Sequence, residues 1–218
     1  YLNNWRFIAN DIPLQNLRSC DINQTNQIQY LIEEIQPKTL FNLAAYGAYS
    51  KQKEYSKIYR TNFVSSVDLI EVIKAKGFNA YVHAGSSSEY GLNATAPKED
   101  GELLPNSHYA VSKAAFYQAM HYYGKVEELP VVHLRLYSAY GAWEETDRLI
   151  PILLAKARKG TYPPLVNPRI SRDFIYINDM IQAFIKAAKN AHSDIKGEAL
   201  NIGTSVKTDI GQLADMVQ

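Results

Sequence analysis

Residues 80–91 read AYVHAGSSSEYG, a short apolar run followed directly by a glycine and three serines. The run at 80–84 predicts a buried β-strand, and the serines at 86–88 then lie just beyond its carboxyl end. In parallel α/β sheets, ligands bind outside the carboxyl ends of the strands. The serine hydroxyls are therefore candidates to hydrogen-bond a substrate oxygen, and a plain polar turn is the alternative interpretation.

Similar short β-like runs alternate with longer helical patterns on both sides of this strand. Pro37 stops the first helical pattern, and Gly77 can cap the second one at its carboxyl end. This alternation predicts an α/β fold built on a parallel sheet. The expected strands are 39–45, 80–84, 131–136, 173–177 and 199–202, and the expected helices are 25–36, 63–73, one through 109–113, 147–159 and one after 208.

Tyr109 and Lys113 lie four residues apart in the predicted helix that follows the serine turn. Residues at this spacing share one face of a helix, so the phenol and the ammonium are expected to project into one site. A free tyrosine has a pKa of about 10, and a neighbouring cation favours the phenolate and lowers that value. The pair is therefore a candidate acid/base group, although Tyr-x-x-x-Lys also arises by chance in a chain with 16 tyrosines.

Composition and charge argue against several classes of function. The chain of 218 residues carries 23 basic and 22 acidic residues without a long basic run, so neither nucleic acid nor a membrane is expected as a partner. Its longest apolar stretches fall short of the roughly 18–20 residues that span a bilayer. Cys20 is the single cysteine, which suits a reducing, cytoplasmic compartment, and no cluster of His, Cys and carboxylates has the spacing of a metal site.

Several segments in a fixed order resemble a known family. The chain is similar to the extended short-chain dehydrogenases/reductases, and within them to the NAD(P)-dependent nucleotide-sugar epimerases and dehydratases. The matching segments span nearly the whole sequence, and several motifs in order are far more specific than any one of them. They are NLAA at 42–45, GSSSEYG at 85–91, YAVSK at 109–113, RLYSAYG at 135–141, RDFIYIND at 172–179 and NIG at 201–203.

The resemblance implies a Ser-Tyr-Lys catalytic site. Tyr109 would exchange a proton with a sugar hydroxyl or keto oxygen, and Lys113 would bind the nicotinamide ribose and lower the pKa of Tyr109. The serine has two candidates, because this strand end is one residue shorter than the commonest family form. Counting forward from the strand favours Ser87, and counting back from Gly91 favours Ser86.

We prefer Ser87, because Ser88 and Glu89 then fall where several dehydratase-like members carry an acidic partner. In that register Glu89 is a candidate second acid/base. Its alternative interpretation is a solvated loop carboxylate.

The resemblance also implies residues for the cofactor, NAD or NADP, and for the substrate. Asn62 has a purely structural role as its alternative, and the alternative for Arg172 is a salt bridge with Asp173 or another acid. Ser138 replaces the asparagine that is usual in the family. The cofactor set is Asp21 and Ile22 beside the adenine, Leu43, Ala44 and Ala45 in the loop that the cofactor approaches, Asn62, Tyr137, and the catalytic Tyr109 and Lys113; the substrate set is Ser88, Ser138 and Arg172.

The family opens with a strand, a Gly-rich turn and a helix whose N-terminus holds the pyrophosphate. This sequence has no glycine before Gly47, so we expect a fragment of a longer protein or a chain whose ends were not included. The implied fold is a Rossmann-like doubly wound parallel sheet, incomplete at the N-terminus, with a small C-terminal substrate lobe. We expect the dinucleotide-binding core at 1–140, the lobe at 141–170 and 204–218, and a return to the core at 171–203.

The activity implied by the resemblance is that of an NAD(P)-dependent oxidoreductase or isomerase acting on a nucleotide-linked hexose. Epimerisation at C4 and reduction of a 4-keto sugar both fit, because they share one hydride-transfer half-reaction. The alternatives are a nucleotide-sugar 4,6-dehydratase and a non-catalytic scaffold that kept the dinucleotide fold.

Family members commonly pair through a four-helix bundle, and the resemblance therefore implies a homodimer. The helices involved would be the one that carries Tyr109 and the one at 63–73. The alternative is that the apolar faces of both helices are buried against the sheet. The apolar residues behind this expectation are Ala114, Ala115, Phe116, Ala119, Met120 and Tyr123.

Overall fold

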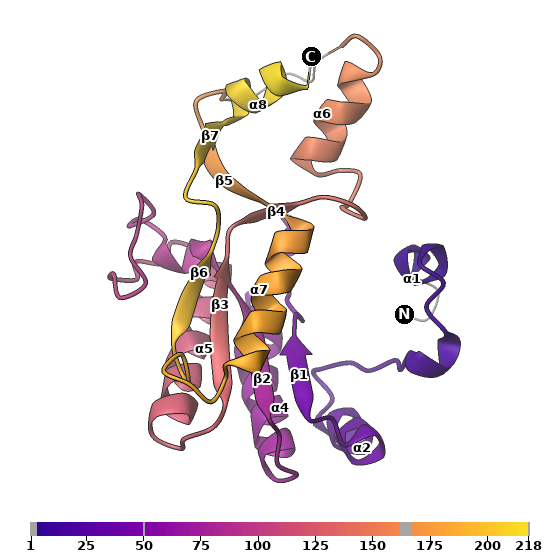
Figure 1. The fold of residues 1–218 in the computed structure, drawn as a ribbon, viewed down its shortest axis with the longest axis vertical. Coiled ribbons are helices and arrows are strands. Elements are labelled where there is room, and N and C mark those ends of the chain that lie inside the picture. Colours follow the sequence, from indigo (N-terminus) through magenta and orange to yellow (C-terminus); the bar gives the residue numbers. More distant parts are fainter. Residues whose placement is uncertain (1–3, 50, 162–166, 218) are drawn as a thin grey trace.

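The computed structural model describes residues 4–49, 51–161 and 167–217. Its centre is a parallel sheet with the spatial strand order β1-β2-β3-β6 (Figure 1). The register pairs Ser86 with Leu136, so β2 and β3 end side by side. The α/β fold with a parallel sheet, predicted from the sequence, is confirmed. The strands are β1 (Thr39–Asn42), β2 (Ala80–Ser86), β3 (Val131–Leu136) and β6 (Ala199–Ile202).

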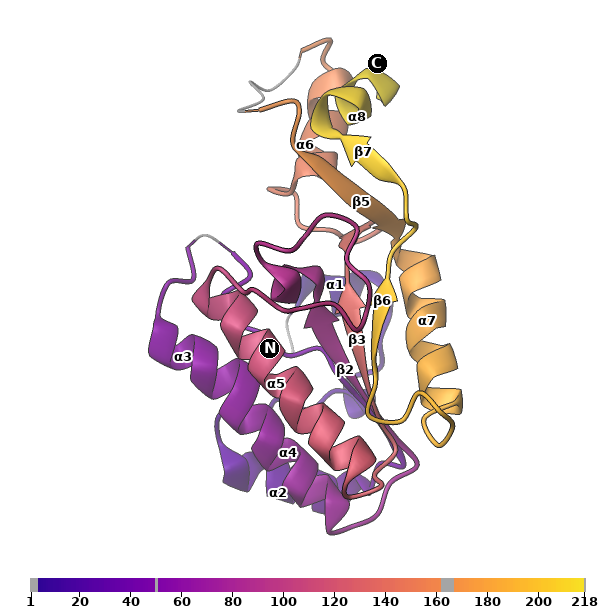
Figure 2. The same cartoon turned by 90° about the vertical axis from the view of Figure 1, so that its left-hand side faces the viewer.

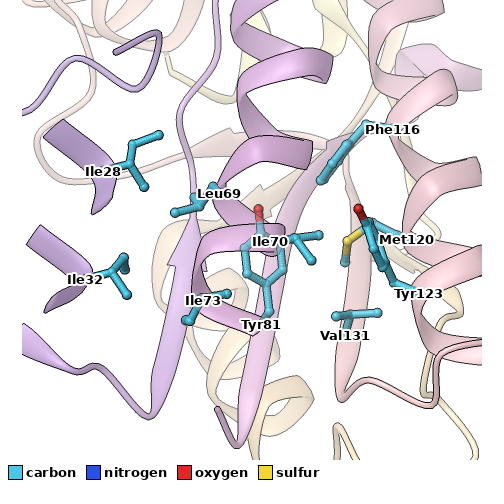
Figure 3. Packing of buried hydrophobic residues seen from close by; sticks show 10 residues of the cluster. All are labelled: Ile28, Ile32, Leu69, Ile70, Ile73, Tyr81, Phe116, Met120, Tyr123 and Val131. Carbon is cyan, nitrogen blue, oxygen red and sulfur yellow. The ribbon is translucent and has the colours of Figure 1, made fainter. Parts of the chain in front are cut away.

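Helices cover both faces of this sheet (Figure 2). Because successive strand residues point to opposite sides, Tyr81 packs with α2, α4 and α5, whereas Val82 packs with α7. Figure 3 shows the first of these two cores, in which Phe116 and Met120 of α5 have no exposed surface. The helices are α2 (Thr25–Ile35), α4 (Ser65–Lys74), α5 (His108–Lys125) and α7 (Ile177–Lys189).

One of these helices begins with an irregular turn. The helix α3 (Tyr55–Tyr59) continues through the π-helical turn η2 (Arg60–Val64) into α4, and Gly77 follows its end with a φ of +70°. A π-helical turn widens the helix locally and is frequent at functional sites. Here it carries Asn62, which is fully buried.

A second, smaller sheet lies beyond the carboxyl ends of the main strands (Figure 1). In it β5 pairs in parallel with β4 and antiparallel with β7. Residues 171–176 therefore belong to the small sheet, and the return to the core that we expected at 171 begins with α7. The segment 162–166 lies outside the described residues. The elements are β4 (Ser138–Tyr140), β5 (Ser171–Tyr176), β7 (Lys207–Asp209), α6 (Leu149–Ala157) and α8 (Ile210–Met216).

The N-terminal segment contacts the chain just after β4. Trp5 of α1 (Trp5–Ala9) lies 5.8 Å from Trp143, measured between ring centres. Arg6 donates to the Trp143 carbonyl over 2.8 Å and pairs with Glu145 at 2.8 Å. A short 3₁₀ turn, η1 (Leu14–Asn16), then leads to α2. No helix in the described ranges combines the length and apolarity that a bilayer crossing requires.

Candidate active site

The serine turn is fixed at the carboxyl edge of the main sheet. Strand β2 ends at Ser86, and the 3₁₀ turn η3 (Ser87–Tyr90) begins at once. The Ser86 hydroxyl accepts hydrogen bonds from the Ser88 backbone N–H (3.2 Å) and from the Ser88 hydroxyl (2.8 Å). The Ser86 backbone N–H in turn donates to Glu89 Oε1 over 2.8 Å. These reciprocal bonds form a capping box, which holds the turn in one conformation.

The helix α5 brings Tyr109 and Lys113 to the same edge. Its N-terminus is capped by Ser107, and Tyr109 is half-buried. The Lys113 side chain, only 1% exposed, donates from Nζ to the Ala84 carbonyl over 2.7 Å and lies 3.3 Å from His83 Nε2. The same Nζ lies 5.9 Å from the centre of the Tyr109 ring. The Tyr109 ring and the Lys113 amine therefore lie close to each other near the end of β2.

Burial dominates the ionisation of both groups. It raises the pKa of the Tyr109 phenol, and the nearby Ser86 hydroxyl opposes this rise while the charge of Glu89 adds to it. Burial also lowers the pKa of Lys113 to about 8, against the opposing effect of Glu89. We expected Lys113 to lower the pKa of Tyr109, but burial of the phenol raises it, and the Lys113 amine donates to the Ala84 carbonyl.

The structure favours Ser86 over Ser87 as the partner of Tyr109. The Ser86 hydroxyl opposes the rise in the pKa of the Tyr109 phenol, whereas Ser87 is the first residue of the turn η3. The sequence favoured Ser87 because Ser88 and Glu89 would then fall where an acidic partner is expected, but the Glu89 carboxylate contacts His133 and Arg135 instead. Strand β2 continues through Ser86, two residues beyond the expected strand end, and we therefore propose Ser86, the residue that the count back from Gly91 favours.

The loop after β1, in which we expected Leu43, Ala44 and Ala45 to contact the cofactor, starts from a buried asparagine. Asn42 is 3% exposed, and its Nδ2 donates to the Tyr81 hydroxyl over 2.8 Å. Its Oδ1 accepts from the Ala44 backbone N–H at 3.1 Å. Leu43, in contrast, is 61% exposed, and Ala45 is exposed as well. The loop therefore has a fixed base and an open outer surface.

Asn62 ties the same loop to α5. Its Oδ1 accepts from the Tyr46 backbone N–H at 2.8 Å, and its Nδ2 donates to the Tyr46 carbonyl (2.8 Å) and to the Ser112 hydroxyl (2.9 Å). Asn62 has no exposed surface, so the structural alternative for this residue is favoured over direct contact with a cofactor.

Four further residues implied by the family resemblance lie on separate segments of the chain. Ile22 packs against the core that contains α2, α4 and α5, and its neighbour Asp21 is exposed. Tyr137 directly follows β3, and its backbone N–H donates to the Ile202 carbonyl over 3.1 Å. Ser138 is the first residue of β4, so the chain passes from the main sheet to the small sheet at this point.

Arg172 belongs to the small sheet rather than to the serine turn. It is exposed on β5, opposite Thr208 of β7. Within the described ranges it forms no ion pair, and the Asp173 carboxylate instead accepts from the Thr204 and Ser205 backbone N–H groups over 2.9 and 2.8 Å. The structure thus brings Ser86, Tyr109 and Lys113 together and places Arg172 on a separate element.

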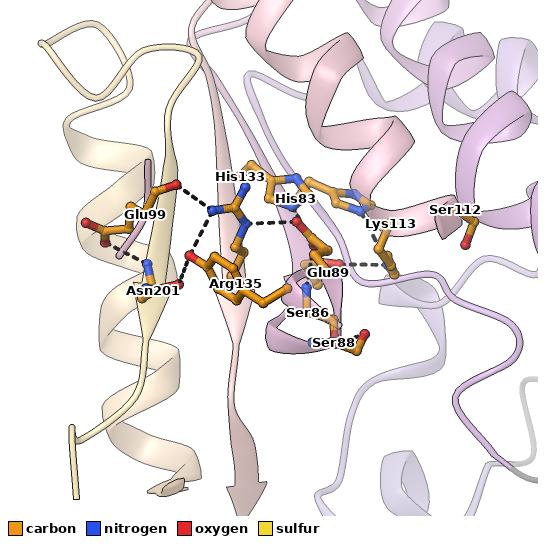
Figure 4. A network of polar contacts seen from close by, with 12 residues as sticks. His83, Ser86, Ser88, Glu89, Glu99, Ser112, Lys113, His133, Arg135 and Asn201 are labelled. Atoms are coloured by element: carbon orange, nitrogen blue, oxygen red, sulfur yellow. Dashed lines mark hydrogen bonds and ion pairs between the residues drawn. The ribbon is translucent and has the colours of Figure 1, made fainter. Parts of the chain in front are cut away.

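A buried charged cluster lies directly behind the serine turn, and sequence reasoning missed it (Figure 4). Glu89, His133 and Arg135 have no exposed surface. Glu89 Oε1 lies 2.9 Å from His133 Nε2, and Glu89 Oε2 accepts from Arg135 Nε over 2.9 Å. Burial raises the pKa of Glu89, but His133, the Ser86 N–H and Arg135 outweigh that effect and leave the pKa below its usual value. Glu89 is therefore neither a solvated loop carboxylate nor free to act as the second acid/base that we expected.

Two features of the sequence could have revealed this cluster. Arg135 interrupts an otherwise apolar strand, and a buried guanidinium requires a carboxylate partner. Gly85 is paired with Arg135 across β2 and β3, and a side chain there would overlap the His133 ring and the Glu89 carboxylate. The glycine thus leaves the space that the cluster fills.

Comparisons with known proteins identify the family of the chain. Residues 3–203 match the model of the NAD dependent epimerase/dehydratase family. The chain belongs to this family. UDP-glucuronate 4-epimerase 6 of Arabidopsis thaliana is 27% identical over 91% of this chain and 47% of its own length. UDP-glucuronate 4-epimerase 3 of the same plant is 30% identical over 78% of this chain and 42% of its own length. The chain thus spans about half the length of these curated relatives.

Solved structures give the same result for the fold. A UDP-glucuronic acid 4-epimerase from Bacillus cereus, in complex with UDP-glucuronic acid and NAD, superposes with a TM-score of 0.82 at 25% identity, over 99% of this chain and 69% of that one. A dTDP-glucose 4,6-dehydratase from Bacillus anthracis, in complex with NAD, gives a TM-score of 0.77 at 26% identity, over 91% of this chain and 62% of that one. The family membership that the sequence motifs predicted is confirmed.

Proposed function

We propose that the protein containing this chain is an NAD(P)-dependent enzyme that epimerises a nucleotide-linked hexose at C4 or reduces its 4-keto form. The observation that carries the proposal is the meeting of Ser86, Tyr109 and Lys113 at the carboxyl ends of the sheet strands. The relatives named UDP-glucuronate 4-epimerase and the solved 4-epimerase complex with UDP-glucuronic acid and NAD support the same class of substrate and cofactor.

The residues at this edge fit a dinucleotide cofactor. The small side chains of Ala44 and Ala45 let a ligand approach the backbone closely, and the bonds from Asn42 hold that backbone in place. Lys113 offers a buried amine for the ribose hydroxyls. The other residues that we expect along NAD or NADP are Asp21, Ile22, Leu43 and Tyr137. When bound, the nicotinamide supplies a hydride acceptor or donor.

The ionisation of the site suits proton transfer by Tyr109. Its raised pKa keeps the phenol protonated at neutral pH, so it can donate a proton to a keto oxygen. The Ser86 hydroxyl opposes the rise in the pKa of Tyr109, and we propose that it orients the substrate oxygen. Lys113, with a pKa of about 8, remains largely protonated at pH 7 and supplies the positive charge that favours a phenolate in the reverse direction. Substrate contacts beyond this centre are proposed for Ser88, Ser138 and Arg172.

Two alternative functions have less support. A 4,6-dehydratase also needs an acid and a base to eliminate water, and its one candidate, Glu89, uses both carboxylate oxygens inside the buried cluster. A non-catalytic scaffold has no need of a buried lysine whose pKa is lowered to about 8 beside a tyrosine.

The proposal is tested on the full-length protein with a panel of nucleotide sugars. Nicotinamide absorbance and product mass are recorded with NAD and with NADP, and each substrate is compared with the corresponding free sugar. We expect a 4-epimer or a 4-hydroxy product from at least one nucleotide sugar and none from the free sugars. Loss of water from the substrate would identify a dehydratase, and inertness towards the whole panel would contradict the proposal.

We also propose a homodimer that uses α5 and the helix formed by η2 and α4. Most of the apolar residues behind this expectation belong to the chain's own core, because Phe116, Met120 and Tyr123 are at most 5% exposed. The proposal rests instead on Val111 and Tyr122 of α5, which are 37% and 49% exposed.

Light scattering on the full-length protein tests this pairing. We expect a dimer mass for the wild type, a monomer mass for Tyr122→Arg, and a dimer mass for Tyr30→Arg, a control on the outer surface of α2 that is 66% exposed. A monomeric wild type would contradict the pairing.

We also propose a cytoplasmic location. Cys20 is the single cysteine, which suits a reducing compartment, and localisation of a tagged full-length protein would test this proposal.

A further inference from the structure

Glu89 connects the charged cluster to the candidate catalytic serine. Its Oε2 faces Arg135, while its Oε1 lies 2.8 Å from the Ser86 backbone nitrogen and 2.9 Å from His133 Nε2. All three partners come from β2 or β3, so the carboxylate bridges the ends of two neighbouring strands. It lies behind the serine turn and has no exposed surface, so it does not touch a substrate.

We propose that Glu89, held by Arg135 and His133, is a positioning residue that aims the Ser86 hydroxyl at Tyr109. The inference rests on the proposed function of the Ser86, Tyr109 and Lys113 site. The bond from the Ser86 N–H to Glu89 holds the backbone and therefore the position of Cβ, from which the hydroxyl projects, and only the rotation about Cα–Cβ is left to set. Ser88 completes the restraint, because its N–H and its hydroxyl both donate to Ser86 Oγ.

The surrounding contacts make this arrangement rigid. Arg135 also donates to the Tyr90 hydroxyl (2.9 Å) and to the Glu99 carbonyl (2.8 Å), so its guanidinium cannot follow a displaced carboxylate. The Tyr90 hydroxyl in turn donates to Asn201 on β6 over 2.8 Å. These contacts connect Ser86 to three strands of the main sheet, β2, β3 and β6.

A simpler role for Glu89 would be to neutralise Arg135. Two double variants of the full-length protein distinguish neutralisation of Arg135 from positioning of Ser86. Glu89→Gln/Arg135→Met removes both charges but keeps a side-chain carbonyl that can accept the Ser86 N–H. Glu89→Leu/Arg135→Met removes both charges and the carbonyl. Replacing a buried ion pair by apolar residues often leaves a fold stable, so both variants can be compared as folded proteins.

Two readouts are recorded for both variants: hydrogen exchange of the Ser86 amide, and kcat with the nucleotide sugar that the wild type turns over. We expect the Leu variant to exchange the Ser86 amide at least about tenfold faster than the Gln variant, because its N–H has no acceptor. We expect its kcat to be at least about tenfold lower as well, since a misplacement of 1 Å can cost about a hundredfold in rate. Amides of β1 serve as the internal control and should exchange equally in both variants.

Equal Ser86 exchange in the two folded variants would overturn the inference, as would unequal exchange with equal kcat. The exchange comparison needs no turnover, so an inactive wild type would contradict the proposed function while the exchange still decides whether Glu89 restrains Ser86. If the Leu variant does not fold, Glu89→Met/Arg135→Leu removes the same carbonyl with the two side-chain volumes exchanged, and it is compared with Glu89→Gln/Arg135→Leu.

Discussion

Replacing Asn62 by alanine should loosen the loop after β1 without touching a group that acts on the substrate. The asparagine makes three hydrogen bonds, two with the Tyr46 backbone and one with the Ser112 hydroxyl, at 2.8 to 2.9 Å. Each such bond contributes about 1 kcal/mol net, so the loss of all three predicts a fall of about 3 kcal/mol in the free energy of unfolding.

The same change should weaken cofactor binding. A loop that is no longer held by Asn62 must be ordered when the cofactor binds, and fixing the backbone of one residue costs about 1–2 kcal/mol. This corresponds to a dissociation constant for NAD or NADP that is about tenfold higher. The matched control is Ser112→Ala, which leaves both Tyr46 bonds intact. It should lower stability by about 2 kcal/mol, since Ser112 also donates to the Tyr109 carbonyl, and should leave cofactor affinity unchanged.

Urea unfolding of the full-length variants measures the first effect, and titration calorimetry with the preferred dinucleotide measures the second. The reasoning is refuted if Asn62→Ala unfolds within about 0.5 kcal/mol of the wild type, which is the usual range of surface substitutions. It is also refuted if Ser112→Ala weakens cofactor binding as much as Asn62→Ala does, because the effect would then not depend on the Tyr46 loop.

Three further predictions concern the site. Tyr109→Phe should keep cofactor affinity and lose about 10²–10⁴-fold in turnover, and steady-state kinetics beside calorimetry would check both. Lys113 has a folded-state pKa of about 8, below that of an unfolded lysine, so the unfolded chain binds more protons between pH 8 and about 10.4. Wild-type stability should therefore rise across that window relative to Lys113→Met in parallel unfolding curves, and superimposable pH dependences would contradict the burial effect. Gly85→Ala should lower both stability and turnover because its methyl group overlaps His133 and Glu89, and a wild-type melting temperature would show that the cluster adapts.

The fold was predictable wherever local sequence patterns decide it. The run at 80–84 marked β2 correctly, and the helical pattern at 25–36, stopped by Pro37, became α2 at Thr25–Ile35. The segment at 173–177 also marked a real strand, but a pattern of five residues does not say which sheet a strand joins. The pairing of β5 with β4 and β7 therefore came only from the structure.

The site was predictable for residues whose role depends on spacing along one element. Tyr109 and Lys113 were found because four residues on a helix define one face. The Glu89 and Arg135 pair joins the turn η3, which follows β2, to β3 across 46 residues of sequence, and it depends on strand order, which no local pattern reveals. The ionisation of Tyr109 also escaped prediction, since the burial that raises its pKa follows from packing rather than from the neighbouring lysine.

In the proposed mechanism Tyr109 transfers the proton that accompanies hydride transfer, and Ser86 orients the substrate oxygen. Single-turnover mixing of the full-length enzyme with its nucleotide sugar, followed by nicotinamide absorbance, tests it most directly in the wild type, Tyr109→Phe, Ser86→Ala and Ser87→Ala. We expect a rapid absorbance change in the wild type and in Ser87→Ala, and a change slowed at least about tenfold in the other two variants. A change at the wild-type rate in Tyr109→Phe, or a slowing in Ser87→Ala that Ser86→Ala does not show, would contradict it.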